Sequence, residues 1–348
     1  KLNLVMGIDK AIIESDVPTV NRHIAFRHNL TESIFQNTEG SKIISQIPRM
    51  HAFWFVSVGT PEKNKQKYFI YDATAGLEIL KKWNLEEDVV AKTKELHENL
   101  IKGKKTPKGK IDVLCGPEVT GIATHESVGH PNEADRILSR ESAQAGESFV
   151  TPELLNKKYG NEIVNVSDDP TIPGSAGFYK YDAEGVKARK RRLIKNGILN
   201  EFLHNRETAV ELGLKSNAAA RATAFDREPI VRMANTFIEP GDYTRDELIA
   251  DTKKAIYIKN FMEWNIDDKR FNQKYVGAAA FYVENGEIKY PIHDPILEIT
   301  TPAFWNAIDA VANDLELNAA TCGKGEPSQG VPVFHGGPTI RLRNIRIR

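Results

Sequence analysis

Cysteine, long apolar runs and net charge are all scarce in this sequence. The two cysteines, Cys115 and Cys322, are too few and too far apart for a disulfide framework, and they favour a reducing compartment such as the cytoplasm. The longest apolar run, around residues 52–56, is too short to cross a bilayer. Acidic and basic residues balance at 47 each, so no overall field favours nucleic acid or an anionic membrane as a partner.

The length and the order of the sequence patterns predict two domains of an α+β protein. Strand-like alternation occupies residues 1 to about 75, and an amphipathic helical pattern follows. The lysine- and glycine-rich stretch 102–110 then breaks this pattern. We expect an N-terminal α/β domain over residues 1–107 and a larger, strand-rich domain of mixed or antiparallel sheets over residues 108–348. The chain opens at Lys1 without a methionine, so we expect the first domain to be incomplete at its start.

Local patterns predict individual elements in the second part of the chain. They are, in order, a hairpin turn at Asn196-Gly197, a continuous strand over residues 230–238, a short helix opened by the Thr244/Glu247 capping box, a hairpin turn at Asn285-Gly286 and a helix over residues 301–315.

Two histidines and a glutamate, His125, Glu126 and His130, form the most informative cluster of the chain. Imidazoles ligate zinc, and a neighbouring carboxylate can serve as a base. The usual zinc-peptidase pattern has its histidines four apart, whereas these are five apart, so a regular helix cannot aim both at one ion. A π-type widening would reduce the offset. We expect instead that the helix ends near Gly129, because Pro131 moves His130 out of the helical region.

The surrounding sequence supports a built site at this motif. Residues 111–115 predict a buried strand, and residues 116–118 predict the start of a helix. A strand followed by a short helix would hold the histidine motif rigidly in place. The spacing alone does not exclude the alternative that these histidines only make structural hydrogen bonds. The motif, however, resembles the TldD/PmbA family of zinc metallopeptidases, once described as modulators of DNA gyrase. Blocks that resemble this family follow in order: Glu133-Ala134-Asp135, Asp182–Gly185, Ile194–Leu199, Arg232–Thr236 with Pro240-Gly241, and Cys322-Gly323-Lys324.

The resemblance extends from about residue 40 to residue 338 and implies that Cys322 is the third ligand of one zinc ion per chain. Three protein ligands leave the fourth position open, as in a catalytic zinc site. Glu126 would then act as the general base for a water that attacks a peptide carbonyl. One departure from the family pattern is the lengthened stretch 325–328 before Gln329, which bears on the detailed geometry near Cys322.

The resemblance also implies unfolded or short peptides as substrates, and pairing as a homodimer or as a heterodimer with a related subunit that lacks the metal motif. Arg232, Asn235 and His204 are the candidates for substrate binding, and His335 is a further candidate for stabilising the transition state. We expect no nucleic-acid partner and no membrane partner. The alternative function is that of a non-catalytic, zinc-stabilised regulator that binds peptides or proteins.

Overall fold

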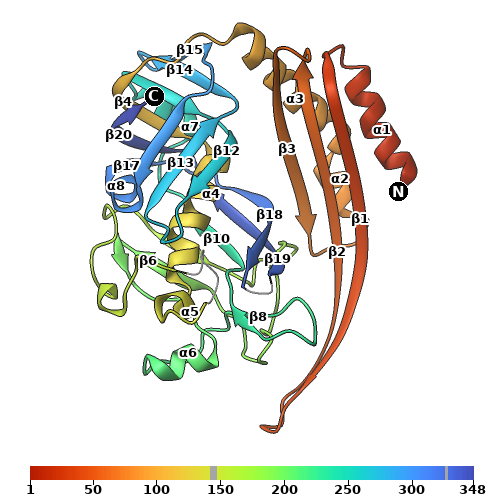
Figure 1. Cartoon of the computed structure of the whole chain (residues 1–348), viewed down its shortest axis with the longest axis vertical. Helices are drawn as coiled ribbons and strands as arrows, with labels where there is room; N and C mark the ends of the chain where they lie inside the picture. Colours follow the sequence, from red (N-terminus) through yellow and green to blue (C-terminus); the bar gives the residue numbers. More distant parts are fainter. Residues whose placement is uncertain (142–146, 326–327) are drawn as a thin grey trace.

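The N-terminal part of the chain is a three-stranded antiparallel sheet with helices packed against it (Figure 1). The computed structural model describes residues 1–141, 147–325 and 328–348. The elements of this part are α1 (Leu2–Ile13), β1 (Thr19–Gln36), β2 (Lys42–Gly59), β3 (Asn64–Ala73), α2 (Ile79–Trp83) and α3 (Leu85–Lys102). Strands β1 and β2 form a long hairpin arm that extends past the end of β3 (Figure 1).

Alternating burial along β2 explains how this sheet holds its helices. Trp54 and Val56 point into the helix-covered face, and the Trp54 ring stacks on Phe69 of β3 at 4.2 Å between centroids. The strands and the helical stretch that we predicted here are confirmed, and the helical stretch is divided into α2 and α3 at Asn84. The expectation of strand-like structure from residue 1 is wrong, because residues 2–13 form α1. Ile8 and Ile12, one helical turn apart, are both buried in the same core.

The remainder of the chain consists of two mixed sheets with α4 (Pro117–Thr124) between them (Figure 1). The six-stranded sheet has the order β18 (Glu316–Lys324), β19 (Gln329–Gly337), β10 (Asn235–Ile238), β5 (Val166–Asp168), β6 (Arg191–Lys195) and β7 (Ile198–Leu199). The larger sheet has the order β12 (Phe261–Ile266), β13 (Asn272–Gly277), β16 (Ile296–Thr300), β20 (Ile340–Ile347), β4 (Gly109–Cys115), β11 (Lys254–Ile258), β14 (Ala280–Glu284) and β15 (Glu287–Pro291), with β17 (Ile308–Val311) also on β20.

Most strand pairs in these two sheets are antiparallel, while β10 with β19 and β11 with β4 are parallel. The smaller elements are α5 (Ala134–Ile137), α6 (Arg206–Glu211), α7 (Arg245–Ala250), α8 (Thr301–Ala307) and the β8 (Ala220–Arg221) to β9 (Ile230–Val231) pair. The strand-rich α+β architecture is therefore confirmed. Among the described residues, no helix has the length and apolar character needed to cross a membrane.

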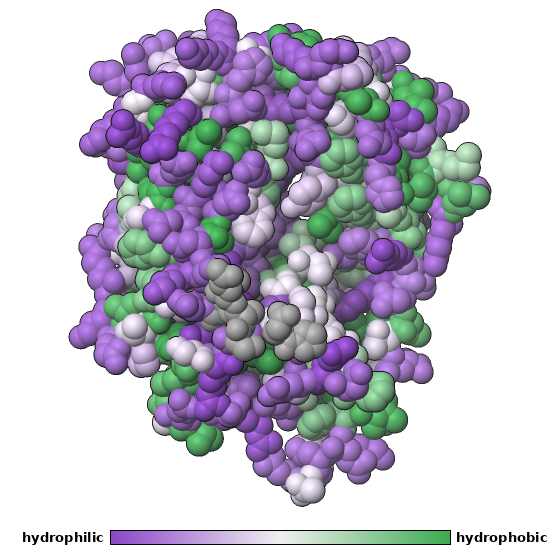
Figure 2. All heavy atoms as spheres, viewed as in Figure 1, coloured by the Kyte–Doolittle hydropathy of each residue, from purple (hydrophilic) through white to green (hydrophobic). Residues whose placement is uncertain are grey.

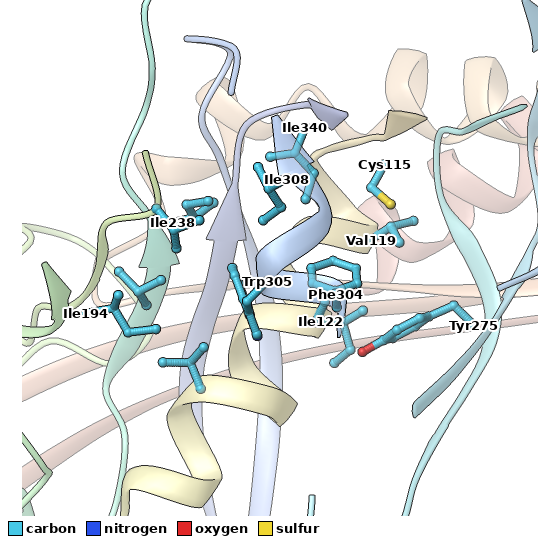
Figure 3. Close-up of a cluster of buried hydrophobic side chains, with 14 of the residues drawn as sticks. Cys115, Val119, Ile122, Ile194, Ile238, Tyr275, Phe304, Trp305, Ile308 and Ile340 are labelled. Carbon is cyan, nitrogen blue, oxygen red and sulfur yellow. The ribbon is translucent and has the colours of Figure 1, made fainter. Parts of the chain in front are cut away.

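The central core lies where α4 meets both sheets, and Figure 3 shows part of it. Val119 and Ile122 of α4 are buried among side chains that come from strands far apart in the sequence, including Ile194, Ile238, Ile308 and Ile340. Because α4 is enclosed from several sides, almost all of its residues are buried. This packing fixes the position of the motif that follows α4.

The local predictions in this part are mostly confirmed. Asn196-Gly197 and Asn285-Gly286 connect hairpins and have positive φ at both positions, and the Thr244/Glu247 capping box opens α7. Two predictions are wrong. The helix expected over residues 301–315 ends at Ala307, because residues 308–311 pair with β20, and the strand expected over residues 230–238 is split into β9 and β10.

Candidate metal centre

The helix that carries the histidine motif widens instead of ending. α4 continues without a break into a π turn over His125–Gly129, followed by a 3-10 turn over His130–Asn132. The His130 N–H donates to the carbonyl of His125, which is the i→i+5 bond of a π-helix, and His130 keeps right-handed helical dihedrals. The expectation that the helix ends near Gly129 is therefore wrong, and the π-type alternative is what occurs.

Tertiary contacts explain why the proline did not stop the helix. Pro131 has no N–H to offer the Ser127 carbonyl, and this carbonyl instead accepts a hydrogen bond from the Tyr159 hydroxyl at 2.5 Å. The Val128 carbonyl accepts one from the Asn132 side chain at 2.7 Å. Because side chains satisfy these buried carbonyls, the widened turn is stable inside the protein. Tyr159 lies 32 positions from Ser127, so a local sequence rule could not anticipate its contribution.

The widened turn and β18 bring together three side chains that can ligate a metal. Cys322 Sγ lies 3.3 Å from His125 Nε2 and 3.2 Å from His130 Nε2, and the three ligand atoms lie within 4.8 Å of one another. A tetrahedral zinc ion needs sulfur and nitrogen ligands about 3.6 Å apart, so a small adjustment would accommodate it. Within the described parts of the chain, this is the one such group of three or more residues.

The environment of these three residues favours the protonation states of metal ligands. Burial lowers the pKa of both His125 and His130, which keeps the imidazoles neutral. Burial alone would raise the pKa of the Cys322 thiol, but its electrostatic interaction and hydrogen bond with His130, together with the charge of Arg232, outweigh burial and lower this pKa to about 7. Neutral imidazoles and a thiolate are the forms that bind zinc, so the donor set fits this ion.

Glu133 fixes the orientation of the second histidine. Its Oε2 accepts hydrogen bonds from His130 Nδ1 at 2.9 Å and from Arg136 Nε at 2.7 Å, and Lys324 Nζ lies 3.3 Å away. Burial would raise the pKa of Glu133, but the charge of Lys324, the interaction with His130 and the charge of Arg136 hold this pKa well below its usual range. A carboxylate on Nδ1 leaves Nε2 of His130 directed at Cys322.

Lys324, two residues after Cys322, ties the end of β18 to the motif. Its Nζ donates to Asp135 Oδ1 at 2.6 Å and to the Val231 carbonyl at 2.7 Å. Asp135 in turn accepts from the Val231 N–H at 3.2 Å. Lys324 was part of the recognised Cys-Gly-Lys block, yet only the structure reveals that its side chain is buried between two carboxylates. Two residues of the lengthened stretch that follows, 326 and 327, lie outside the described residues.

The three candidate ligands line a cavity of about 810 Å³ together with Glu126. The cavity lies between β3 of the N-terminal sheet and β18, and Figure 2 shows the surface hollowed between the two parts. Glu126 is buried, and its Oε2 accepts a hydrogen bond from the Arg270 guanidinium at 2.8 Å. Arg270 lies in the loop between β12 and β13, and sequence reasoning missed it because that loop has only an ordinary turn composition.

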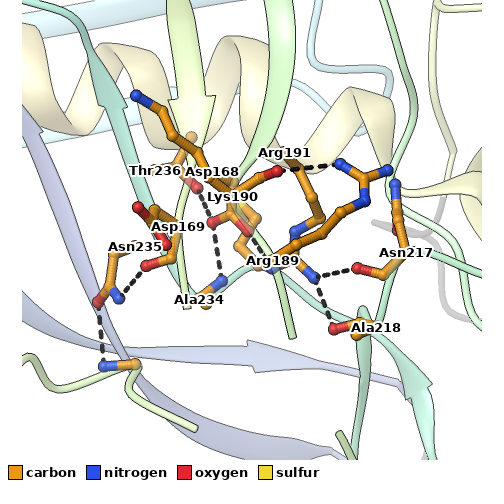
Figure 4. A network of polar contacts seen from close by, with 12 residues as sticks. Asp168, Asp169, Arg189, Lys190, Arg191, Asn217, Ala218, Ala234, Asn235 and Thr236 are labelled. Atoms are coloured by element: carbon orange, nitrogen blue, oxygen red, sulfur yellow. Dashed lines mark hydrogen bonds and ion pairs between the residues drawn. The ribbon is translucent and has the colours of Figure 1, made fainter. Parts of the chain in front are cut away.

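All three residues predicted to bind substrate, Arg232, Asn235 and His204, lie outside the lining of this cavity. The Arg232 guanidinium donates to the Cys322 carbonyl and, at 2.7 Å, to the Gln329 carbonyl. It therefore stabilises the β18–β19 hairpin from outside the cavity lining. Asn235 donates to the Asp169 carbonyl at 2.6 Å and accepts from the Gly177 N–H at 3.0 Å, as part of the network in Figure 4. His204 is buried, and burial lowers its pKa to about 4.

His335 lines the cavity on the other side of the first ligand. Its ring centroid lies 6.2 Å from that of His125 in an edge-on arrangement. Burial is the main reason why the pKa of His335 falls to about 3, so the ring is neutral. A neutral imidazole could donate a hydrogen bond to a ligand in the cavity.

The fold and the site define a strand-rich α+β protein with three residues that could hold a metal ion in the wall of a cavity. The model of the PmbA/TldA metallopeptidase C-terminal domain matches residues 108–348. The chain therefore belongs to the PmbA/TldA metallopeptidase family.

Similar proteins agree with this assignment. A metalloprotease of Methanothermobacter thermautotrophicus is 36% identical over 317 residues, which cover 91% of this chain and 67% of that protein. A zinc metalloprotease TldD homolog of Saccharolobus solfataricus is 34% identical over 251 residues, 72% of this chain and 54% of that protein. Among solved structures, TldE from Thermococcus kodakarensis has a TM-score of 0.75 at 17% identity, covers 99% of this chain and 73% of its own, and bears on the fold alone.

Proposed function

We propose that this protein is a zinc-dependent peptidase that hydrolyses unfolded or short peptides, with His125, His130 and Cys322 as the ligands of one zinc ion. The observation that carries the proposal is the convergence of these three side chains beside the buried Glu126, in a cavity large enough for a peptide segment. The relatives named metalloproteases support the same reading.

The three ligands fit a catalytic ion better than a structural one. A structural zinc site has four protein ligands, and the described residues supply three. Cys115, the remaining cysteine, is buried in the core, and burial raises the pKa of its thiol well above the ordinary value. When bound at such a site, zinc supplies Lewis acidity, which acidifies water and polarises carbonyl oxygens.

The residues of the chain would perform the proton transfers. Glu126 accepts a proton from the attacking water as the water oxygen bonds to the peptide carbonyl carbon. When the C–N bond breaks, the same carboxylic acid gives this proton to the leaving amine nitrogen. Glu133 keeps His130 in the tautomer that presents Nε2, through the 2.9 Å hydrogen bond at Nδ1.

The position of the site supports flexible peptides as substrates. All three candidate ligands are buried, and the cavity walls come from both parts of the chain. A folded protein cannot bring its backbone to the Cys322 sulfur through such a cavity, whereas an extended peptide segment can. We propose no nucleic-acid substrate, since the chain has no excess of basic residues.

Partner and compartment complete the proposal. We propose that the chain forms a homodimer, or a heterodimer with a related subunit without the metal motif. The likeness of its fold to that of TldE supports a related subunit as partner. We propose a cytoplasmic location, because both cysteines are buried and form no disulfide. Free thiols of this kind are typical of a reducing compartment.

Replacement of Glu126 by glutamine tests the proposal against the rival function, a zinc-stabilised regulator that binds peptides without cutting them. We expect the variant to keep its zinc and its affinity for peptides while hydrolysis falls by orders of magnitude. The matched control is Glu95→Gln, because Glu95 also pairs with a basic side chain, Lys259, but lies outside the cavity lining. Hydrolysis that survives Glu126→Gln, or wild-type protein that holds zinc and cuts no peptide, would favour the regulator.

A further inference from the structure

The Arg270 guanidinium contacts Glu126 in the cavity, through the 2.8 Å hydrogen bond from its Nη1 to Glu126 Oε2. We propose that the Arg270 guanidinium also contacts the carbonyl oxygen of the scissile peptide bond and binds the negative charge that develops there. This inference rests on the proposed peptidase function and adds the electrophilic group that the reaction needs beside its base.

The loop around Arg270 is built to hold this side chain in place. Arg270 has a left-handed backbone conformation, with φ of 65°, which costs about 1 kcal/mol or more for a residue with a side chain. Its N–H donates to the Asp267 carbonyl at 2.9 Å, and its carbonyl accepts from the Thr301 hydroxyl at 2.7 Å. The Asp267 carboxylate also accepts from the Phe271 N–H at 2.7 Å. These contacts fix the backbone from which the Arg270 side chain reaches Glu126.

The chemistry of the guanidinium suits the role. Arginine stays protonated at working pH, and its planar fork carries five N–H donors, so it can bond a carboxylate and a neighbouring oxygen together. In the attack, water lies between the Glu126 carboxylate and the carbonyl carbon. The carbonyl oxygen is then one bond from the reacting carbon, within reach of a group that touches Glu126.

The electron flow defines what Arg270 stabilises. As the water oxygen bonds to the carbonyl carbon and loses a proton to Glu126, the π pair of the carbonyl moves onto its oxygen. Arg270 N–H groups donate to this oxygen, whose charge is greatest at this point. When the carbonyl reforms, the C–N bond breaks and the proton on Glu126 passes to the amine nitrogen, so that no further reactant is needed.

A competing role is that Arg270 only holds Glu126 in position. Two ligands separate the roles: an intact peptide that the wild-type protein cleaves, and its phosphinic analogue, which carries a charged oxygen in place of the carbonyl oxygen. Binding is measured by calorimetry in the Glu126→Gln background, with and without Arg270→Gln, and zinc is quantified for each protein. Lys269→Gln is the matched control, because Lys269 is the adjacent residue and its side chain is exposed.

We expect Arg270→Gln to weaken phosphinic binding by about 100-fold in the Glu126→Gln background, while zinc content stays unchanged. Intact-peptide affinity should change by less than about threefold, because that contact strengthens only as charge develops. With Glu126 present, kcat should fall by about 100- to 1,000-fold with little change in KM. Lys269→Gln should change none of these values.

Equal weakening of both ligands, or a phosphinic effect that disappears once Glu126 is replaced, overturns the inference and leaves Arg270 as a positioning residue. Should Arg270→Gln fail to fold, Arg270→Lys decides in its place: about tenfold weaker phosphinic binding with unchanged peptide binding supports the role. Equal effects of the lysine variant on both ligands reject it. Wild-type protein that holds zinc but cleaves no peptide rejects the proposed function itself, before any Arg270 variant is made.

Discussion

The sulfur of Cys322 lies 3.2 Å from Nε2 of His130, although 192 positions separate the two residues. The His130 side of this contact is fixed by α4 and its π turn, and the Cys322 side by β18 of the six-stranded sheet. The three-residue group therefore exists only when the helix has docked against the sheet. A metal bound there would stabilise the folded protein as well as serve chemistry.

Removal of the thiol should remove the metal. We expect Cys322→Ala to lower the zinc content of the purified protein from about one ion per chain to near zero, because two imidazoles alone bind zinc weakly. Cys115→Ala is the matched control: this cysteine is buried in the core, so its loss should cost about 1 kcal/mol of stability and leave zinc in place. Elemental analysis after dialysis measures both. Equal zinc content in the two variants would contradict the assigned ligand set.

The Glu133 carboxylate should matter for both metal affinity and stability. Glu133→Gln leaves Lys324 and Arg136 with less negative charge to offset them, so we expect a loss of about 3 kcal/mol in the free energy of unfolding. Zinc affinity should fall about 10- to 100-fold, because His130 loses the carboxylate on Nδ1. Denaturant titration and competition with a zinc chelator measure the two effects. The exposed Glu207, which pairs with Arg140, provides the control Glu207→Gln, expected to change stability by less than about 0.5 kcal/mol.

Features of the site that depend on neighbouring residues in the sequence could be predicted, whereas features that depend on contacts with distant residues could not. The spacing of His125 and His130 correctly excluded a regular helix, because the helical repeat is a local property. It could not decide between a widened turn and a helix end, since the Tyr159 hydroxyl that stabilises the turn comes from elsewhere. Cys322 entered through family resemblance alone. Arg270 carries no local pattern, and only the packing of the β12–β13 loop places it beside Glu126.

The fold shows the same division. Hairpins at Asn196-Gly197 and Asn285-Gly286 and the Thr244 capping box follow from local chemistry, and the structure contains all three. Residues 308–311 continue a helical pattern in the sequence but form β17, because pairing with β20 outweighs a weak local preference. The boundary between residues 107 and 108 stays a prediction.

His204 should make stability depend on pH. Burial lowers its folded-state pKa to about 4, against an ordinary value of 6.5, so between these values the unfolded chain binds more protons. Stability should therefore fall as pH drops from about 6.5 to about 4, by up to about 3 kcal/mol from this residue. We expect His204→Leu to flatten this part of the profile, measured by denaturant titration at several pH values. His28→Leu, at an exposed position of β1, should leave the slope as it is, and a slope that His204→Leu does not alter would reject the prediction.

Gly129 sets how closely the π turn approaches the segment between β9 and β10, which contains Met233. A Cβ added at Gly129 would lie 1.8 Å from Sδ of Met233, which is buried. We expect Gly129→Ala to cost about 1–3 kcal/mol of stability by overpacking. The displaced turn should also lower zinc affinity, because His130 directly follows Gly129.

The double variant tests this cause. Met233→Ala alone should cost about 2–5 kcal/mol through the cavity that it leaves. In the double variant, the methyl group added at residue 129 enters this cavity. The total loss of stability should therefore be smaller than the sum of the two single losses. Zinc affinity, measured by chelator competition, should recover in the double variant relative to Gly129→Ala. Strictly additive costs with no recovery of zinc affinity would show that the steric contact with Met233 does not position His130.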